Sequence, residues 1–90
     1  MTAAEKLRAA GYDDVLIFEN YSYDEALVGV TEDNRAVYEY DKMVTWLMET
    51  EGWSLEDAVD WIEYNTIRAL PYMGQEAPII MYRITEEDLF

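Results

Sequence analysis

Apolar positions recur with a helical period in two neighbouring stretches near the middle of the chain. The first stretch predicts a helix over residues 42–51 and the second a helix over residues 55–69, because residues three and four apart share one face of a helix. The expected inward face of the first helix consists of Tyr40, Met43, Val44, Leu47 and Met48. The expected inward face of the second helix consists of Leu55, Ala58, Val59, Ile62 and Ala69. Together they predict a helical hairpin, with Trp46 and Trp61 at the edges of the two stripes.

The hinge and the two ends of this hairpin carry helix-stop and helix-start residues. Gly52 is able to adopt the left-handed conformation that ends a helix. Ser54 followed by Asp57 resembles a capping box, although the usual residue at the second position is Glu or Gln. We expect Asp41 to cap the first helix and Pro71 to end the second.

Shorter apolar runs with β-branched residues predict strands. Residues 26–31 and 35–40 flank a short polar turn and form the clearest β-hairpin of the chain. Gly29 is expected at a bulge or at a close approach of another backbone. Residues 79–84 are the most apolar run, which places this strand inside the sheet. Residues 15–18 are expected to form a short fourth strand.

A short helix over residues 3–10 is expected at the N-terminus, where Thr2 and Glu5 have capping-box spacing. Residues 85–88 are acidic and predict a turn. Runs of strands segregated from runs of helices favour the α+β class. We therefore predict a single acidic α+β domain over residues 1–90, with a small antiparallel or mixed sheet of three to four strands packed against the helical hairpin.

Acidic residues outnumber basic residues by 20 to 6, which gives a formal net charge of −14 without any histidine. A surface of this sign repels phosphate backbones, so we expect no direct binding to nucleic acid and none to anionic membranes. It attracts basic protein surfaces instead. No apolar stretch approaches the roughly 20 residues that span a bilayer, and the N-terminal residues lack the apolar run of a signal peptide. These features predict a cytoplasmic protein.

The residue types on which most enzymes depend are missing. Without histidine or cysteine, the chain lacks the usual general base at neutral pH, the strongest nucleophile and any sulfur ligand for a metal. Asp13 with Asp14, and the run Glu86–Asp88, are oxygen-rich clusters that suit Ca²⁺ or Mg²⁺, but neither has EF-hand spacing. We therefore predict no catalytic residue, no cofactor and no metal site. A carboxylate-based Ca²⁺ or Mg²⁺ binder or enzyme is the weakest alternative.

Four acids lie along the expected outer face of the second helix. Glu56, Asp60 and Glu63 recur at i, i+4 and i+7, and Asp57 lies alongside. Their charges form a ridge with a spacing of roughly 5 to 6 Å along the helix axis. Phosphates of nucleic acid form a comparably dense row, so such a ridge would fit a basic groove made for DNA or RNA. The plainer alternative is a solvated helix face with acids favoured near its N-terminus.

Two aromatic residues are candidates for contact with a partner. Aromatic residues at helical spacing usually pack into the core, and we expect most of those in this chain to do so. If exposed beside the acids, Trp53 and either Tyr64 or Tyr72 would form a hot spot for a protein partner. Arg68 is expected to tie the end of the second helix to Asp41 or Glu39.

Two segments carry a resemblance to known proteins. The runs GVTEDNRAVYEYDKMVTWLMETEGWS and WIEYNTIRALPY are similar to segments of uncharacterised small acidic proteins of Gram-positive bacteria and their phages. The resemblance covers about residues 26–84. It implies a bacterial or phage-borne cytoplasmic setting, and it supplies no activity, fold or site residues.

The preferred hypothesis is a non-enzymatic binding protein whose acidic surface meets a basic protein partner. Its sharpest form is a phage-type nucleic-acid mimic, and its partner-binding residues are Glu56, Asp57, Asp60, Glu63, Trp53 and Tyr64. The second hypothesis is a small structural or assembly homodimer, formed through a sheet edge or through the tryptophan-rich hairpin.

Overall fold

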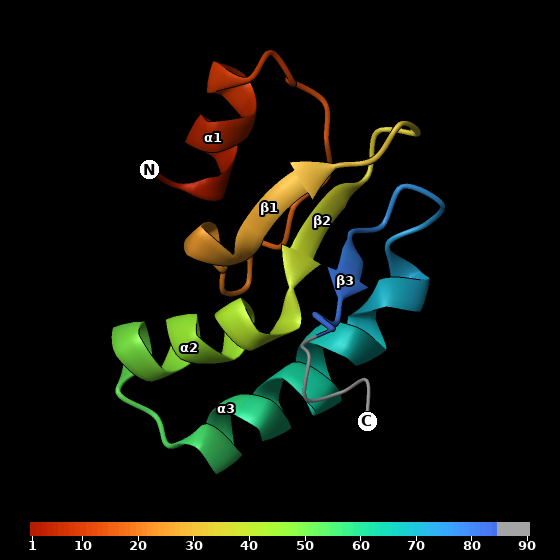
Figure 1. Cartoon of the computed structure of the whole chain (residues 1–90). Coiled ribbons are helices and arrows are strands. Elements are labelled where there is room, and N and C mark those ends of the chain that lie inside the picture. Colours follow the sequence, from red (N-terminus) through yellow and green to blue (C-terminus); the bar gives the residue numbers. More distant parts are fainter. Residues whose placement is uncertain (85–90) are drawn as a thin grey trace.

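Three strands form a mixed sheet in which β2 is the central strand (Figure 1). β1 (Leu27–Val30) runs antiparallel to β2 (Ala36–Glu39), and β3 (Ile79–Met81) runs parallel to β2 on its other side. The parallel pair requires a crossover connection, and the helical hairpin between β2 and β3 supplies it. The computed structural model describes residues 1–84, so the predicted turn at residues 85–88 lies outside the described residues.

The helices confirm the predicted α+β class. α1 (Ala3–Ala9) precedes the sheet, and α2 (Tyr40–Glu51) follows β2 directly. α3 (Leu55–Trp61) runs back beside α2 and continues into a π-helical segment (Ile62–Ile67) and a 3₁₀ turn (Leu70–Tyr72), as Figure 1 shows. Within residues 1–84, none of the helices combines the length and the apolar character needed to cross a bilayer.

The capping box predicted at the N-terminus is confirmed. The Thr2 hydroxyl accepts a hydrogen bond from the Glu5 N–H at 3.1 Å, and the Thr2 N–H donates to the Glu5 carboxylate at 2.9 Å. The bond from the Thr2 N–H to the carboxylate lowers the pKa of Glu5, because it stabilises the charged form. The Lys6 ammonium then docks the helix by donating to the carbonyls of Asp24 at 2.6 Å and Leu27 at 3.1 Å. A helix this short depends on such tertiary contacts.

The predicted β-hairpin is confirmed, together with its bulge near Gly29. The register shifts by one residue between Leu27 and Gly29, so Val28 is the extra residue of β1. The turn is closed by the Thr31 N–H, which donates to the Arg35 carbonyl at 2.8 Å.

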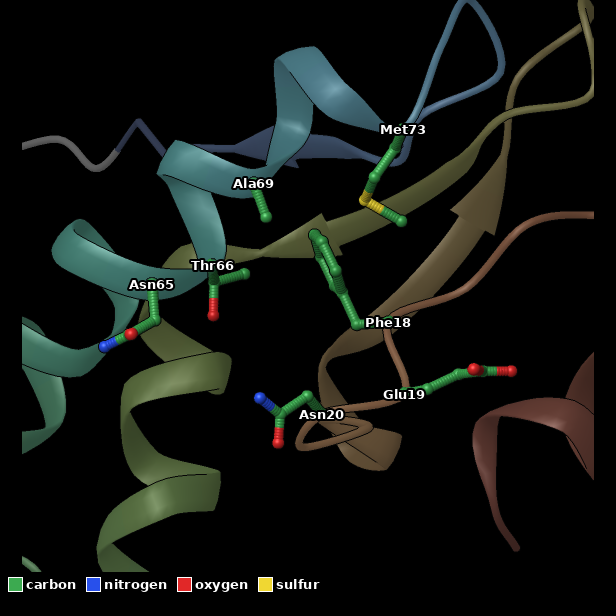
Figure 2. A pocket seen from close by; sticks show the side chains of 7 residues that line it. All are labelled: Phe18, Glu19, Asn20, Asn65, Thr66, Ala69 and Met73. Atoms are coloured by element: carbon green, nitrogen blue, oxygen red, sulfur yellow. The ribbon is translucent and has the colours of Figure 1, made fainter.

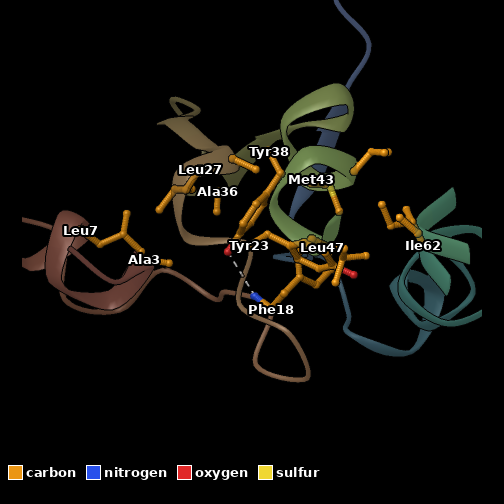
Figure 3. Packing of buried hydrophobic residues seen from close by; sticks show 13 residues of the cluster. Ala3, Leu7, Phe18, Tyr23, Leu27, Ala36, Tyr38, Met43, Leu47 and Ile62 are labelled. Atoms are coloured by element: carbon orange, nitrogen blue, oxygen red, sulfur yellow. Dashed lines mark hydrogen bonds between the residues drawn. The ribbon is translucent and has the colours of Figure 1, made fainter. Parts of the chain in front are cut away.

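The strand predicted over residues 15–18 is wrong, because this segment has no regular secondary structure. Phe18 is buried, and its N–H donates to the side-chain hydroxyl of Tyr38 at 3.3 Å rather than to a strand (dashed line in Figure 3). Val15 and Ile17 are half-buried against the core. The apolar residues of this segment therefore serve packing, which a short apolar pattern does not distinguish from strand formation.

The prediction that the last strand lies inside the sheet is also wrong. β3 pairs only with β2 among the described residues and forms an edge of the sheet. Ile79 and Ile80 are half-buried by the packing on the sheet faces, while Met81 is exposed. An apolar strand indicates that other elements pack on the faces of the sheet. It does not indicate whether the strand is central or at an edge.

The hinge signals are confirmed, but the first cap is not. Glu39 is the N-cap of α2, so the prediction for Asp41 is wrong; β2 leads straight into the helix, and Asp41 falls in the first turn. Gly52 has φ +70° and ends α2 in the left-handed conformation. The Ser54 hydroxyl accepts from the Asp57 N–H at 3.1 Å and starts α3.

The π-helical segment changes which side chains face inward. A π-helix closes i→i+5 bonds, so it shifts the phase of the residues that follow it. Ile62 and Thr66 are buried, and Ile67 and Leu70 pack partly against the core. Ala69 is exposed. The prediction that Ala69 packs into the core is therefore wrong, and its side chain lines an open cavity beside Phe18 and Met73.

Side chains from the sheet, the hairpin and the loop before β1 share one buried cluster (Figure 3). The cluster contains most of the predicted helix faces, including the buried Met43, Val44, Leu47, Ala58 and Ile62. Met48 and Leu55 were predicted to face inward, but they are exposed, since both lie at the hinge end of the hairpin, beyond the core.

Tyr38 gives a test of this core. Burial raises the pKa of Tyr38 to about 12 from its ordinary value of 10.0. The folded state therefore holds the phenol proton more tightly than the unfolded state. The contribution of Tyr38 to stability is fully present below pH 10 and is lost as the pH rises towards about 12, by roughly 2 to 3 kcal/mol.

We expect Tyr38→Phe to cost about 1 kcal/mol at neutral pH, because the Phe18 N–H loses its acceptor. The variant should then lose less stability than the unmodified chain above pH 10. Urea unfolding at a series of pH values measures both effects, and Tyr72→Phe, at a fully solvated ring, is the control. An unchanged alkaline slope in Tyr38→Phe would contradict the assignment.

Candidate protein-binding surface

The four acids of the acidic ridge (Glu56, Asp57, Asp60 and Glu63) are all exposed on α3 and on the first turn of the π-helical segment. The cap at Ser54 uses the backbone N–H of Asp57 and leaves its carboxylate in solvent. Within residues 1–84, the carboxylates of Glu56, Asp57 and Asp60 have no hydrogen-bond or ion-pair partner. These three charges are therefore available to an external cation.

Glu63 differs from the other three acids of the ridge. Its carboxylate accepts a hydrogen bond from the Tyr40 hydroxyl at 3.1 Å. Partial burial and this contact with Glu63 raise the pKa of Tyr40 to about 12. The Tyr40 ring also lies against Tyr82, with 5.0 Å between the ring centroids. Glu63 therefore helps to join the π-helical segment to the start of α2.

The six bases of the chain all lie within the described residues, and none neutralises the ridge. Lys42 and Arg83 both approach Glu39 at 3.7 Å. Arg35 donates to the Ala77 carbonyl at 2.8 Å. Together with Lys6, whose ammonium contacts backbone carbonyls, four of the six bases are therefore engaged in contacts away from the ridge.

Arg68 does not make the predicted ion pair with Asp41 or Glu39. Its guanidinium lies over the exposed ring of Tyr64, 5.0 Å from the ring centroid. Glu39 pairs instead with Lys42, three residues further along the chain, and with Arg83, because the parallel register sets Glu39 opposite Met81, close to Arg83. The ion pair between Glu39 and Arg83 depends on the pairing of β2 with β3, which lie about 40 residues apart in the sequence. Helical spacing does not indicate such a pair.

An aromatic cluster lies beneath the hinge side of the ridge. The ring of Tyr21 is surrounded by three tryptophans, at centroid distances of 6.3 Å to Trp46, 5.5 Å to Trp53 and 5.2 Å to Trp61. All three contacts have an edge-to-face geometry, which is a favoured arrangement for aromatic pairs. Trp53 and Trp61 are themselves 5.6 Å apart. The cluster thus holds Trp53 in the hinge and Trp61 at the end of α3 in place.

The loop that supplies Tyr21 is unusual in its backbone. Tyr21 and Tyr23 have φ values of +65° and +48°, in the left-handed region that non-glycine residues rarely adopt. Tyr23 is fully buried, which raises the pKa of its phenol, and its hydroxyl shares a 2.5 Å hydrogen bond with Thr66. The strain is therefore balanced by aromatic packing and by a bond to the π-helical segment.

A shallow hollow of about 360 Å³ opens between the aromatic cluster and the ridge. We call it the aromatic-acidic hollow. It is lined by Trp53, Asp57, Asp60, Trp61, Tyr64 and Asn65. Four of these residues belong to the predicted partner-binding set, and the fold brings them together here. The other two predicted residues, Glu56 and Glu63, lie outside the hollow on the same ridge.

Sequence reasoning did not assign Trp61 and Asn65 to the site. Trp61 was taken as the edge of the core stripe, although it follows Asp57 by four residues and therefore shares its helix face. The Asn65 amide donates to the Trp61 carbonyl at 3.3 Å. Asn65 and Tyr64 both lie in the π-helical segment, which no periodic pattern of apolar residues indicates.

A second cavity, of about 200 Å³, lies between the loop before β1 and the π-helical segment (Figure 2). In Figure 2 the side chains of Phe18 and Met73 point toward each other, with Ala69 beside them, while the Glu19 carboxylate points away. The surface of the cavity is therefore mostly apolar, with Asn20, Asn65 and Thr66 as its uncharged polar residues. It places no pair of ionisable groups where acid–base chemistry would need them.

The described residues contain no group of three or more carboxylates arranged to hold a metal ion. Asp13 and Asp14 are exposed, and Asp14 accepts a hydrogen bond from Asn34 at 3.2 Å. The other acidic run considered from the sequence, Glu86–Asp88, lies outside the part of the chain that the structure describes. The geometry of residues 1–84 therefore gives no support to a metal-based activity.

The chain matches no protein-family model, no curated protein and no solved structure. Its function is therefore inferred from the geometry of the described residues, and the best-defined feature is the acidic ridge with its adjoining hollow.

Proposed function

We propose that this chain is a non-enzymatic cytoplasmic protein that binds a basic surface of another protein through the outer face of α3. The observation that carries the proposal is the row formed by Glu56, Asp57 and Asp60, which no base within residues 1–84 neutralises. An exposed aromatic ring, Tyr64, lies at the end of this row. Aromatic residues are enriched in protein interfaces, and complementary charges around them give specificity and fast association.

The charge of the whole chain supports fast association with such a partner. A net charge of −14 steers cationic surfaces toward the protein and raises the association rate, an effect that falls steeply with salt. A single exposed ion pair contributes only about 0 to 1 kcal/mol. Several adjacent carboxylates facing one basic groove are therefore needed, and the ridge provides them.

The nucleic-acid mimic is the sharpest form of this proposal. The ridge repeats its charge at roughly 5 to 6 Å along α3, a spacing that suits side chains arranged to contact phosphates. The resemblance to small acidic proteins of Gram-positive bacteria and their phages implies a bacterial or phage-borne setting, and the partner that the ridge would fit is a protein that normally binds DNA. Such a partner would lose access to DNA while the ridge occupies its groove.

Capture experiments test the proposal. We expect immobilised protein to retain a basic partner from bacterial lysate at low salt, and to release it when NaCl is raised or when duplex DNA is added. Charge reversal with Glu56→Lys and Asp60→Lys should weaken the isolated complex about tenfold or more, because like charges then oppose each other. Glu63 is left unchanged, since its contact with Tyr40 makes it part of the fold.

The matched control reverses two exposed acids away from α3, Asp13→Lys and Glu32→Lys. These changes alter the net charge equally and should weaken the complex only slightly at physiological salt, where charges are screened beyond about 8 Å. A tight complex that ignores salt, DNA and the ridge substitutions would contradict the proposal. Equal losses in both double variants would show a general charge effect without a site.

Arg68 provides a second test, because it is the single base between residues 55 and 72. We expect Arg68→Gln to tighten binding of a fluorescein-labelled oligoarginine peptide by roughly two- to threefold, since one repulsive charge beside the ridge is removed. Arg68→Lys keeps the charge and should bind like the unmodified chain. Fluorescence anisotropy measures the affinities, and weaker binding by Arg68→Gln would refute this role of the ridge.

The edge strand β3 favours a homodimer as the second candidate function. Met81 is exposed at the end of β3, and Tyr82 and Ile84, which directly follow the strand, are 60% and 74% exposed. Exposed apolar edge strands are ready sites for pairing with another chain. Charge repulsion between two copies opposes such a dimer, so it should form only at moderate or high salt.

Analytical ultracentrifugation at rising salt decides between monomer and dimer. A dimer through β3 should be abolished by Tyr82→Lys, which adds charge to the edge, and should survive Tyr64→Lys on the other surface. A monomer at all salt concentrations would remove this second candidate.

A further inference from the structure

We propose that the aromatic-acidic hollow is the anchor point of the interface and that it receives an arginine side chain of the basic partner. This inference rests on the proposed function and deepens it, because it names the side chain that the site selects. The hollow combines aromatic walls with two unneutralised carboxylates. That combination is complementary to a planar cation carried on an apolar stem.

The aromatic walls are held in place from behind. Trp53 and Trp61 both pack edge-to-face against Tyr21, at 5.5 Å and 5.2 Å. Neither tryptophan is free to turn without breaking these contacts, so both walls are ordered before any ligand arrives. Pre-organisation lowers the entropic cost of binding, which favours recognition of even a single side chain.

The two carboxylates come from adjacent turns of one helix face. Asp57 and Asp60 are three residues apart, which sets their Cβ atoms roughly 5 to 6 Å from each other. Neither carboxylate has a partner within residues 1–84. A guanidinium has five N–H donors in a planar fork, so it is able to contact both carboxylates, whereas a lysine ammonium is a compact point charge.

A guanidinium already occupies an aromatic ring at the edge of the hollow. Arg68 lies over Tyr64 at 5.0 Å, although Arg68 is not part of the lining. This contact shows that the ring accepts a stacked guanidinium, and an arginine of the partner would compete with Arg68 for it. The hollow is also open and shallow, which suits a side chain that protrudes from a protein surface and does not suit an enclosed small molecule.

The first experiment uses three short peptides, each with one central residue flanked by glycines and with blocked ends. The central residue is arginine, lysine or citrulline, and citrulline has the shape of arginine without its charge. We expect the arginine peptide to shift the indole N–H signals of Trp53 and Trp61 saturably in ¹H–¹⁵N spectra. The lysine peptide should bind roughly two- to fivefold more weakly, and citrulline should give no saturable shift.

Substitutions then locate the binding. Asp57→Asn with Asp60→Asn should weaken the arginine peptide roughly three- to tenfold. The control Asp13→Asn with Asp41→Asn removes the same charge, and Asp41 also lies in the first turn of a helix, as Asp57 does. This control should change the affinity for the arginine peptide less than twofold, because salt screens charges that lie far from the hollow.

Tyr64 separates aromatic recognition from charge. Its side chain is 61% exposed, so Tyr64→Leu should fold normally while losing the aromatic surface. We expect Tyr64→Leu to weaken the arginine peptide roughly two- to fivefold and Tyr64→Phe to retain binding. Circular dichroism and urea unfolding confirm that each variant is folded before it is titrated.

The outcomes distinguish this inference from the proposed function. Equal binding of arginine and citrulline peptides, or equal losses in the two aspartate double variants, would overturn the anchor while leaving salt-dependent partner capture intact. Conversely, selective binding of the arginine peptide in the hollow, together with no salt-sensitive capture of a basic partner, would support the pocket and contradict the proposed function.

Discussion

The packing of Tyr21 against Trp46, Trp53 and Trp61 is the contact on which the hairpin and the site both depend. Each aromatic pair contributes about 0.5 to 1.5 kcal/mol beyond the area that it buries. Three pairs therefore outweigh the roughly 1 to 2 kcal/mol that a left-handed backbone costs a residue such as Tyr21. Because the three tryptophans come from α2, the hinge and α3, one ring from a distant loop sets the angle between the helices.

The sequence predicted those parts of the fold that local periodicity encodes. The helical hairpin, the β-hairpin with its bulge and the caps at Thr2 and Ser54 all follow from residue types a few positions apart. The unpaired loop around Phe18, the edge position of β3 and the ion pair between Glu39 and Arg83 follow from contacts between distant segments. The periodicity of the sequence does not indicate such contacts, and a short apolar run is compatible with a strand and with an irregular segment packed against the core.

The candidate site was predicted in its chemistry and missed in its shape. The acids of the ridge were identified by their spacing, and the fold gives them different roles. Asp57 and Asp60 line the hollow, Glu56 lies outside it, and Glu63 accepts a hydrogen bond from Tyr40. Trp61 was assigned to the core, because a half-buried tryptophan at the edge of a helical stripe has the same pattern as a buried one. The π-helical segment, which turns Tyr64 and Asn65 toward the hollow, has no such pattern at all.

The positions of the basic residues determine which acidic side chains remain without a partner. Lys6, Arg35 and Arg83 join segments of the fold through carbonyls or Glu39, and these joints leave the outer face of α3 without a cation apart from Arg68. At physiological salt, charges act over about 8 Å, so a partner docked on α3 responds to the local row and hardly to the total of −14. A specific interface therefore requires the local features that this face provides, which are adjacent free carboxylates beside an ordered aromatic wall.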